Sequence, residues 1–263
     1  MTQSISRAKR LLSDRSLQFL GPLALVAVWC VVTYGGLVDT SKLPSPTQLF
    51  EVAAGLITEG FHAVTLQEHI VASLTRALSG FVLAAIAGIL VGLLMGYYRW
   101  ADNLLTLTFS FFRPIPPIAF IPLVVIYFGI GQMSKIVLIF YAAFLYMVLS
   151  AHSGVRTVPD ILIRAGKNVG MSSSQLFMRV LVPGAMPHII SGLRTSISIA
   201  WALIVAAELV AADRGLGYMI MEAGNFYNLP VVYVGIIAIG VIGVLLDGAL
   251  LLLKKRVLHW EGR

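Results

Sequence analysis

Long apolar runs dominate this sequence of 263 residues and limit the folds that are open to it. About twenty consecutive apolar residues are enough to cross the hydrocarbon core of a bilayer as a helix. Hydrophobic residues make up 58% of the chain and charged residues only 12%, whereas soluble domains carry about 25% charged residues. The sequence therefore predicts an all-α, polytopic membrane protein with six transmembrane helices. The predicted spans cover residues 19–38, 77–98, 104–128, 136–155, 189–212 and 231–253.

Basic residues are distributed unevenly along the chain, and their distribution predicts its orientation. With six spans and a cytoplasmic N-terminus, fourteen Lys and Arg residues fall on inner segments and four on outer segments. Because cytoplasmic segments of membrane proteins are rich in Lys and Arg, both termini and residues 156–188 are expected in the cytoplasm. The chain then divides into a basic cytoplasmic segment, residues 1–18, and a single transmembrane domain, residues 19–263. The net charge of +7 follows this pattern and does not indicate a nucleic-acid partner.

A charged and polar stretch, Thr157–Pro187, interrupts the apolar pattern between the fourth and fifth predicted spans. Charged residues near the bilayer centre cost about 2.5–3.5 kcal/mol each, so this stretch is expected outside the membrane. Thr157 and Asp160 match a capping box, which predicts a helix over about Val158–Val169. Gly170 then stands where a left-handed residue ends a helix.

A second short helix is expected after Gly170, because Ser172 and Gln175 form another capping-box pair. Pro183 and Pro187 are expected to close the segment. A short capped helix with an apolar face, placed on one side of a membrane, is suited to contact with another protein. The alternative is a solvated loop that only joins two spans.

The third predicted span cannot be an unbroken helix. Four prolines in nine residues follow Arg113, and each one removes a helical hydrogen bond. Broken backbone at membrane depth is tolerated only where protein covers it or where it lines a water-filled cavity. Arg113, about 15 Å into the span at 1.5 Å per residue, is therefore a candidate for a transport pathway. The alternative is a buried helix break in which freed carbonyl groups satisfy Arg113.

Glycines recur at intervals of four or eight residues in the second predicted span, at positions 80, 88, 92 and 96. Small residues at this spacing let helices approach closely in lipid, so this face is expected to pack against another helix.

Two acidic residues fall inside predicted spans and need partners. Glu208, near the outer end of the fifth span, is expected to pair with Arg76 at the outer start of the second. Asp247 lies seven residues before Lys254, so a local pair on one helix face is expected there. A proton relay through either carboxylate is the weaker alternative, and Glu208 remains a pathway candidate.

No catalytic or metal-binding pattern is apparent. Gly166-Lys167-Asn168 lacks the first glycine and the hydroxyl residue of a phosphate loop, and no HExxH sequence is present. The single cysteine, Cys30, excludes a disulfide framework and a thiolate metal site. The chain is therefore not expected to be an enzyme or to hold a metal. A membrane transport protein without its own ATP-hydrolysing site works passively, uses the gradient of a coupled ion, or takes its energy from a partner protein.

The polar segment resembles the cytoplasmic loop of bacterial ABC importer permeases, which has the form EAA-x3-G-x9-I-x-L-P. Here the loop reads Arg164-Ala165-Gly166, three residues, Gly170, nine residues, and Val180-Leu181-Val182-Pro183. Further segments are similar to the branch that contains taurine, aliphatic sulfonate and nitrate permeases, and the resemblance is closest to taurine permeases. These segments are Leu43–Pro46, Ser73–Arg76, Arg113–Leu123, Phe128–Gly131, Pro183–Arg194, Ala206–Leu209, Arg214–Gly217 and Trp260.

The resemblance implies a type I ABC importer permease fold, also called MetI-like, in the bacterial inner membrane. Two permease copies would form the pathway, two cytoplasmic ABC ATPase subunits would use ATP and Mg, and a periplasmic or lipid-anchored solute-binding protein would deliver the solute. This chain would bind no cofactor itself. The implied solute is a small anion, taurine or another alkanesulfonate, moved by alternating access. Alternatives are nitrate, bicarbonate or a thiamine- or pyrimidine-like solute in the same machine, and, more distantly, an ion-coupled secondary transporter.

The resemblance points to two groups of functional residues, one for coupling to the ATPase and one for the transport pathway. The family's motif glutamate is replaced here by Arg164 and its second alanine by Gly166, so the contact made through that acid does not carry over. The residues expected to couple the chain to the ATPase are Arg164, Ala165, Gly166, Lys167, Gly170, Met171, Ser172 and Pro183. The pathway candidates are Arg113, Pro114, Pro116, Pro117 and Glu208.

Overall fold

The computed structural model describes residues 20–210 and 212–258, and the basic N-terminal segment predicted over residues 1–18 lies outside them. In this part of the chain every named element is a helix, as predicted. Besides the helix Leu20–Tyr34, the elements are α2 Pro46–Thr58, α3 Leu66–Tyr97, α4 Arg99–Phe112, η1 Pro117–Phe120, α5 Ile121–Phe128, α6 Gln132–Arg156, α7 Asp160–Asn168, α8 Ser173–Leu176, η2 Phe177–Leu181, α9 Val182–Val210, α10 Leu216–Asn225 and α11 Leu229–Val257.

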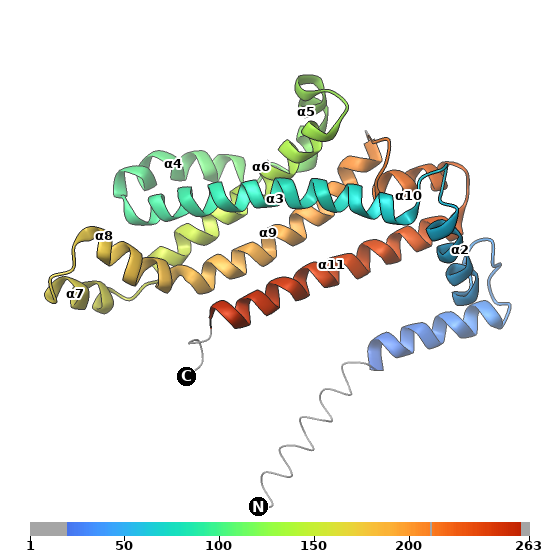
Figure 1. Cartoon of the computed structure of the whole chain (residues 1–263), viewed down its shortest axis with the longest axis horizontal. Coiled ribbons are helices and arrows are strands. Elements are labelled where there is room, and N and C mark those ends of the chain that lie inside the picture. The colour runs from blue at the N-terminus through green and yellow to red at the C-terminus, as the bar shows by residue number, and fades with distance from the viewer. Residues whose placement is uncertain (1–19, 211, 259–263) are drawn as a thin grey trace, which may run out of the picture.

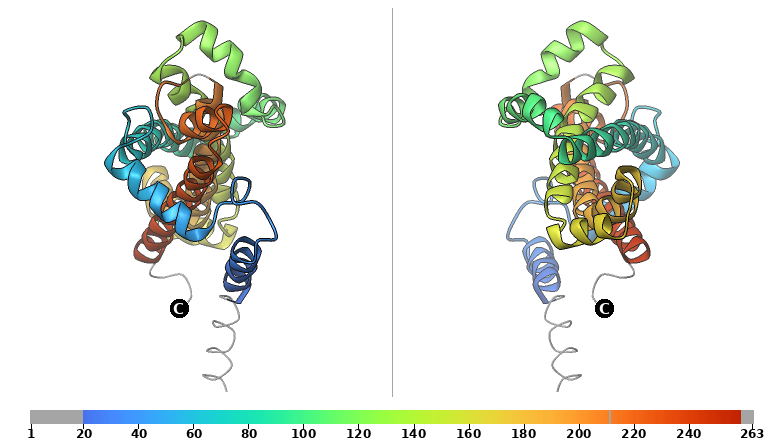
Figure 2. Two further views of the ribbon diagram at one scale, coloured as in Figure 1. Left: turned by 90° about the vertical axis from the view of Figure 1, so that its right-hand side faces the viewer. Right: turned by 90° about the vertical axis from the view of Figure 1, so that its left-hand side faces the viewer.

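Four long apolar helices form the body of the molecule. α3, α6, α9 and α11 run side by side, with α2 and α10 at one end of the bundle and α7 and α8 at the other (Figure 1). The helix Leu20–Tyr34 lies at one edge, and α5 projects on the opposite side (Figure 2). Within the described residues, four helices are long and apolar enough to span a membrane, and the bent pair of α4 with η1–α5 makes a fifth. This count is compatible with the six predicted spans, because the first corresponds to the shorter helix Leu20–Tyr34.

Two helices extend beyond the predicted spans. α3 starts at Leu66, eleven residues before the predicted second span at residue 77, because Thr65 and Glu68 form a complete capping box. The helix of the fifth predicted span starts far earlier than residue 189, because Ser173–Val210 is one helical run that includes the π-helical segment η2. Pro183 and Pro187 therefore do not close the polar segment. Pro183 follows shortly after the π-helical segment η2 and Pro187 lies within α9, so both prolines lie inside the continuous helical run.

The predicted glycine face of α3 is confirmed as a helix contact. It packs against α6, and both helices contribute to the same buried clusters. A β-carbon at Gly88 would lie 2.7 Å from Met147 Cβ, and one at Gly80 would lie 2.8 Å from Ile139 Cβ. Both distances are shorter than a van der Waals contact, so only glycine allows the two backbones to approach this closely.

The partner predicted for Asp247 is wrong. Its carboxylate accepts two hydrogen bonds from Arg194 of α9, from Nε at 2.8 Å and from Nη2 at 2.7 Å. The parallel geometry of guanidinium and carboxylate is stronger than a single contact with a lysine ammonium on the same helix. This pair joins α9 to α11 across the bundle.

Gly92→Ala is expected to destabilise the protein by about 1–3 kcal/mol, because overpacking a tight contact displaces backbone. The added methyl would lie 2.7 Å from Ala151 Cβ and 3.0 Å from the backbone nitrogen of His152. Gly240→Ala is the matched control, because nothing lies within 4 Å of its added β-carbon. Thermal unfolding of the two purified variants in detergent measures the difference. Equal midpoints would contradict the close α3–α6 contact.

Candidate functional site

The short helices α7 and α8 form a compact pair at the end of the bundle opposite α2 and α10 (Figure 1). α7 begins at Asp160, and the capping box predicted from Thr157 is wrong. The Thr157 hydroxyl instead donates to the Gly154 carbonyl at 2.9 Å and closes the end of α6. The predicted glycine end is confirmed, because Gly170 has a φ of +77°. The capping box of Ser172 with Gln175 is also confirmed, and it starts α8.

Gly166 is the one buried residue of α7, and it is one of the two positions that depart from the ABC permease motif. A β-carbon there would lie 2.7 Å from Leu176 Cδ1 and 3.2 Å from Met171 Sδ. An alanine at this position would require the flexible ends of these two side chains to shift. The glycine lets Leu176 of α8 pack directly against α7.

The remaining surface of α7 is open. Arg164, Ala165 and Lys167 are exposed, and the side chains of Ile161 and Leu162 are 70% and 50% exposed. Among the described residues Arg164 has no hydrogen bond or ion pair, so nothing within this chain explains its charge. The structure therefore presents an apolar and basic helix surface at this end of the bundle. Of the other predicted coupling residues, Met171 and Ser172 lie between α7 and α8, and Pro183 lies in the first turn of α9.

The broken third span is confirmed. α4 ends at Phe112, and the following pair of η1 and α5 is bent by 84° from it. Arg113 and the three prolines Pro114, Pro116 and Pro117 line a cavity of about 180 Å³, together with Tyr146 and Leu149 of α6. The Arg113 side chain is exposed, and it makes no hydrogen bond to a carbonyl group among the described residues. The alternative in which freed carbonyls satisfy Arg113 finds no support in this arrangement.

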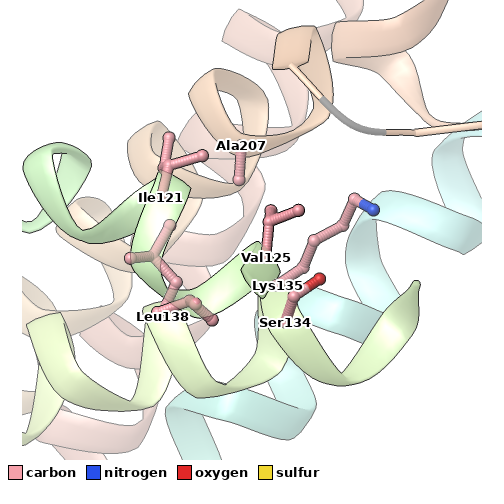
Figure 3. A pocket seen from close by; sticks show the side chains of 7 residues that line it. Ile121, Val125, Ser134, Lys135, Leu138 and Ala207 are labelled. Atoms are coloured by element: carbon pink, nitrogen blue, oxygen red, sulfur yellow. The ribbon is translucent and has the colours of Figure 1, made fainter. Parts of the chain in front are cut away.

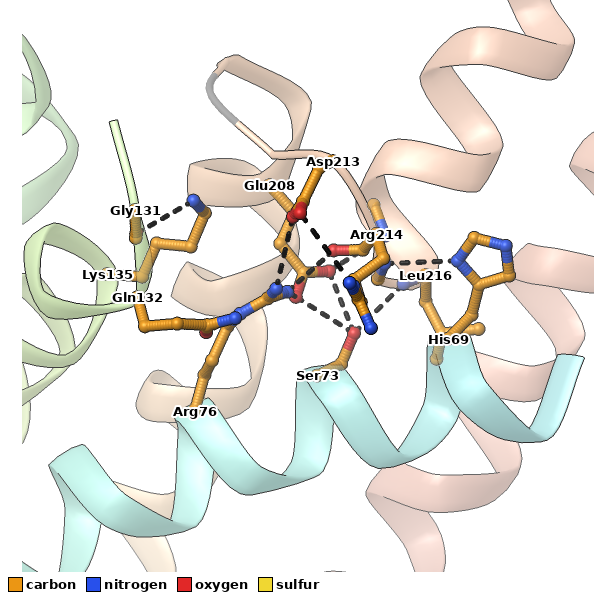
Figure 4. Close-up of polar contacts among 12 residues, drawn as sticks. His69, Ser73, Arg76, Gly131, Gln132, Lys135, Glu208, Asp213, Arg214 and Leu216 are labelled. Carbon is orange, nitrogen blue, oxygen red and sulfur yellow. Dashed lines mark hydrogen bonds and ion pairs between the residues drawn. The ribbon is translucent and has the colours of Figure 1, made fainter. Parts of the chain in front are cut away.

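The predicted pair of Arg76 and Glu208 is confirmed, and it is the centre of a buried polar cluster (Figure 4). Nη1 of Arg76 donates to Glu208 Oε1 at 2.6 Å, and each residue is 1% exposed. The same nitrogen donates to the Arg214 carbonyl at 2.7 Å, and Nε donates to the side chain of Gln132. One guanidinium thus joins α3 to α9, to the α9–α10 connection and to the start of α6. Glu208 lies in this cluster and does not line the Arg113 cavity.

Three successive backbone N–H groups at the start of α10 bind side chains of this cluster. Gly215 donates to His69 Nδ1 at 3.1 Å, Leu216 to Ser73 Oγ at 2.9 Å and Gly217 to Glu208 Oε2 at 3.0 Å. These groups have no partner inside their own helix, and a carboxylate close to them also interacts favourably with the helix dipole. Sequence reasoning missed His69 and Ser73. Their spacing of four and then three residues to Arg76 places all three on one face of α3, which was the available signal.

A second, apolar pocket lies between α5, α6 and α9 (Figure 3). Its volume is about 10 Å³, which is room for about one water molecule, so it does not fit a solute. Lys135 borders this pocket and donates to the Gly131 carbonyl at 3.1 Å. In residues 20–210 and 212–258, no group of three or more His, Cys, Asp or Glu residues could hold a metal ion.

Comparisons with known proteins relate this arrangement to one transport family. A family model described as a binding-protein-dependent transport system inner membrane component matches residues 70–259. The taurine transport system permease protein TauC of Escherichia coli K12 is 41% identical, over 92% of this chain and 89% of that protein. The nitrate import permease protein NrtB of Synechocystis is 33% identical, over 90% of this chain and 87% of that protein. An inward-facing structure of the MetNI methionine ABC transporter superposes with a TM-score of 0.66 at 20% identity, over 73% of this chain and 95% of that chain.

Glu208→Gln is expected to lower stability by about 3–5 kcal/mol, because it leaves the Arg76 guanidinium buried without its carboxylate. Exchanging the two residues, Arg76→Glu with Glu208→Arg, is not expected to restore the stability. Residue 76 must donate to the Arg214 carbonyl, and residue 208 must accept from the Gly217 N–H.

The Arg194 and Asp247 pair is the matched control for this exchange. Apart from their mutual contacts, the two side chains have no other hydrogen bond or ion pair within the described chain. Arg194→Asp combined with Asp247→Arg should therefore recover most of the loss caused by either single change. Folded yield and thermal midpoint measure both exchanges, and full recovery at Arg76 and Glu208 would contradict the cluster described above.

Proposed function

Because the chain belongs to the family of binding-protein-dependent transport system inner membrane components, we propose that it imports taurine or another alkanesulfonate as the transmembrane subunit of an ATP-driven transporter. It is a multi-pass inner-membrane permease component of an ABC importer and not an enzyme. The choice of solute rests on the 41% identity to TauC over 92% of the chain.

The proposed transporter contains several chains. Two copies of this permease form the pathway, and two cytoplasmic ABC ATPase subunits bind ATP and Mg and supply the energy. A periplasmic or lipid-anchored solute-binding protein delivers the anion. Both termini of the permease lie in the cytoplasm, as the distribution of Lys and Arg favours. The chain itself binds no cofactor.

In this proposal α7 is the coupling helix, and its exposed surface is what supports that role. Ile161 and Leu162 offer apolar contact, while Arg164 and Lys167 offer positive charge to a partner. α7 packs on α8 through Gly166, and α8 continues into α9 as one helical run. A push on α7 from a closing ATPase would therefore reach the transmembrane bundle through the α7–α8 contact and this helical run. Such a rigid-body movement is the physical basis of alternating access.

Arg113 supports the choice of an anionic solute. It carries a positive charge, lines a cavity at the break in a membrane-spanning segment, and has no partner within the described residues. A lone cation at this depth attracts anions and repels cations. Its guanidinium can form parallel hydrogen bonds with two oxygens of a sulfonate.

Nitrate is the second candidate solute, because NrtB is 33% identical over 90% of this chain. A guanidinium binds both oxyanions, so Arg113 does not separate them. Bicarbonate fits the same argument, whereas a cationic thiamine-like solute does not. A ligand screen on the solute-binding protein that works with this permease would distinguish these classes.

Gly170→Asp is expected to abolish uptake while leaving the permease inserted in the membrane. The left-handed conformation costs a non-glycine residue about 1–2 kcal/mol, and the new carboxylate would lie at the surface that receives the ATPase. Gly36→Asp is the matched control, since Gly36 has a φ of +68° and is expected on the outer side. Uptake of radiolabelled taurine and ATPase activity in membranes are the measurements. Normal uptake by the Gly170 variant would count against the coupling role of α7.

Arg113→Gln is expected to reduce taurine uptake at least about tenfold, which corresponds to 1.4 kcal/mol of lost anion stabilisation. Its thermal midpoint should stay unchanged, because the side chain has no structural partner. Arg99→Gln, at the start of α4, removes a similar charge away from the cavity and should retain uptake. Loss of folding in the Arg113 variant would instead indicate a scaffold role.

A further inference from the structure

A row of polar side chains lies along one side of α9, and in one of them, Ser191, the side chain has no hydrogen bond among the described residues. His188, Ser191, Thr195 and Ser198 are all exposed, and their spacing places them on one side of the helix. Ser191 and Thr195 lie inside the predicted span 189–212, about 3 and 9 Å from its first residue at 1.5 Å per residue. Polar groups at that depth normally face a protein partner or a water-filled space instead of lipid tails.

α6 supplies polar groups to the same space. A hollow of about 370 Å³ lies between α6, α9 and the broken span, next to the cavity described above. No carboxylate lines it among the described residues. Its polar lining consists of Arg113, Tyr146, Ser150, Ser153, His188, Ser191 and Thr195.

The hydroxyl groups in this hollow differ in their hydrogen bonds. Thr195 donates to the Ser191 carbonyl at 3.2 Å, as a hydroxyl on a membrane helix commonly does. Ser150, Ser153 and Ser191 have no hydrogen-bonded side-chain partner among the described residues. Gly192 leaves room for the side chain of Ser150, because a β-carbon at residue 192 would lie 2.7 Å from Ser150 Oγ. Three free O–H donors and one guanidinium thus face a space that no carboxylate lines among the described residues.

From this arrangement we infer that Ser150, Ser153 and Ser191, together with Arg113, bind the oxyanion group of the solute on its way through the permease. A sulfonate has three acceptor oxygens, which can take the parallel bonds of a guanidinium and a hydroxyl bond as well. The hollow extends from the break in the third span to His188, which lies beside Thr157 at the end of α6. The site therefore covers the part of the pathway between the broken span and the α7 end. This inference rests on the proposed function and names the residues of its pathway.

Thiol labelling tests whether the hollow is open to anions. Cys30→Ser removes the single native cysteine, and Ser191→Cys then adds one thiol to the hollow. The probes are sulfonatoethyl methanethiosulfonate, which is itself an alkanesulfonate, and its trimethylammonium counterpart. Their rates are compared in inside-out and right-side-out membrane vesicles that hold the full transporter. Tyr227→Cys, at a residue that is 89% exposed, normalises the two reagents, and Val244→Cys on an apolar surface of α11 is the buried-in-lipid control.

We expect Ser191→Cys to react with the anionic reagent about tenfold or more faster than with the cationic one, because a positive site concentrates anions. The preference should fall when Arg113→Gln is added. A thiol as unreactive as that of Val244→Cys would overturn the inference, and so would equal normalised rates for both reagents.

Uptake provides a second readout. Combined Ser153→Ala and Ser191→Ala should slow taurine uptake several-fold at unchanged protein level, since two free donors are lost. Thr195→Val should retain uptake, because its hydroxyl is already bonded within α9. Unchanged uptake in the double variant would overturn the inference while leaving the proposed function intact. Failure of the unmodified chain to support taurine uptake would instead contradict the proposed function.

Discussion

Backbone polar groups cannot be left unpaired inside a membrane, and most of this structure follows from that constraint. Long helices satisfy it along α3, α6, α9 and α11. Where the chain leaves a helix, side chains take over. At the start of α10 three successive N–H groups bind His69, Ser73 and Glu208, which α3 and α9 supply. The buried Arg76 charge is needed in turn, because Glu208 would otherwise be an unpaired carboxylate in an apolar bundle.

α9 connects three regions of the molecule. Its C-terminal end carries Glu208, its middle carries Ser191 and Arg194, and its N-terminal end continues into η2 and α8. The hydrogen bonds of Glu208 hold one end of α9, and the helical run to α8 links the other end to α7. One helix therefore joins the surface at α7 to the polar hollow beside Arg113 and to the buried cluster.

The two changes in the family motif differ in the contacts that they make within the chain. Gly166 packs directly against Leu176, whose flexible end would have to shift to make room for a methyl group. Arg164 has no such reason within the chain, since its side chain is exposed. Under the proposed coupling role, its charge belongs to the surface that α7 would offer to the ATPase, and an acidic groove there would complement it.

The sequence by itself determined the features that depend on local chemistry. Apolar length predicts the spans, prolines predict the break after Arg113, glycine spacing predicts the close face of α3, and Gly170 predicts the end of α7. The tertiary structure decided the features that depend on distant partners. Asp247 pairs with Arg194 because α9 brings a guanidinium to it, and Thr157 caps α6 instead of starting α7. Likewise, His69 and Ser73 contact the start of α10, and the serines of α6 and α9 face one hollow, only because helices far apart in the sequence are packed together.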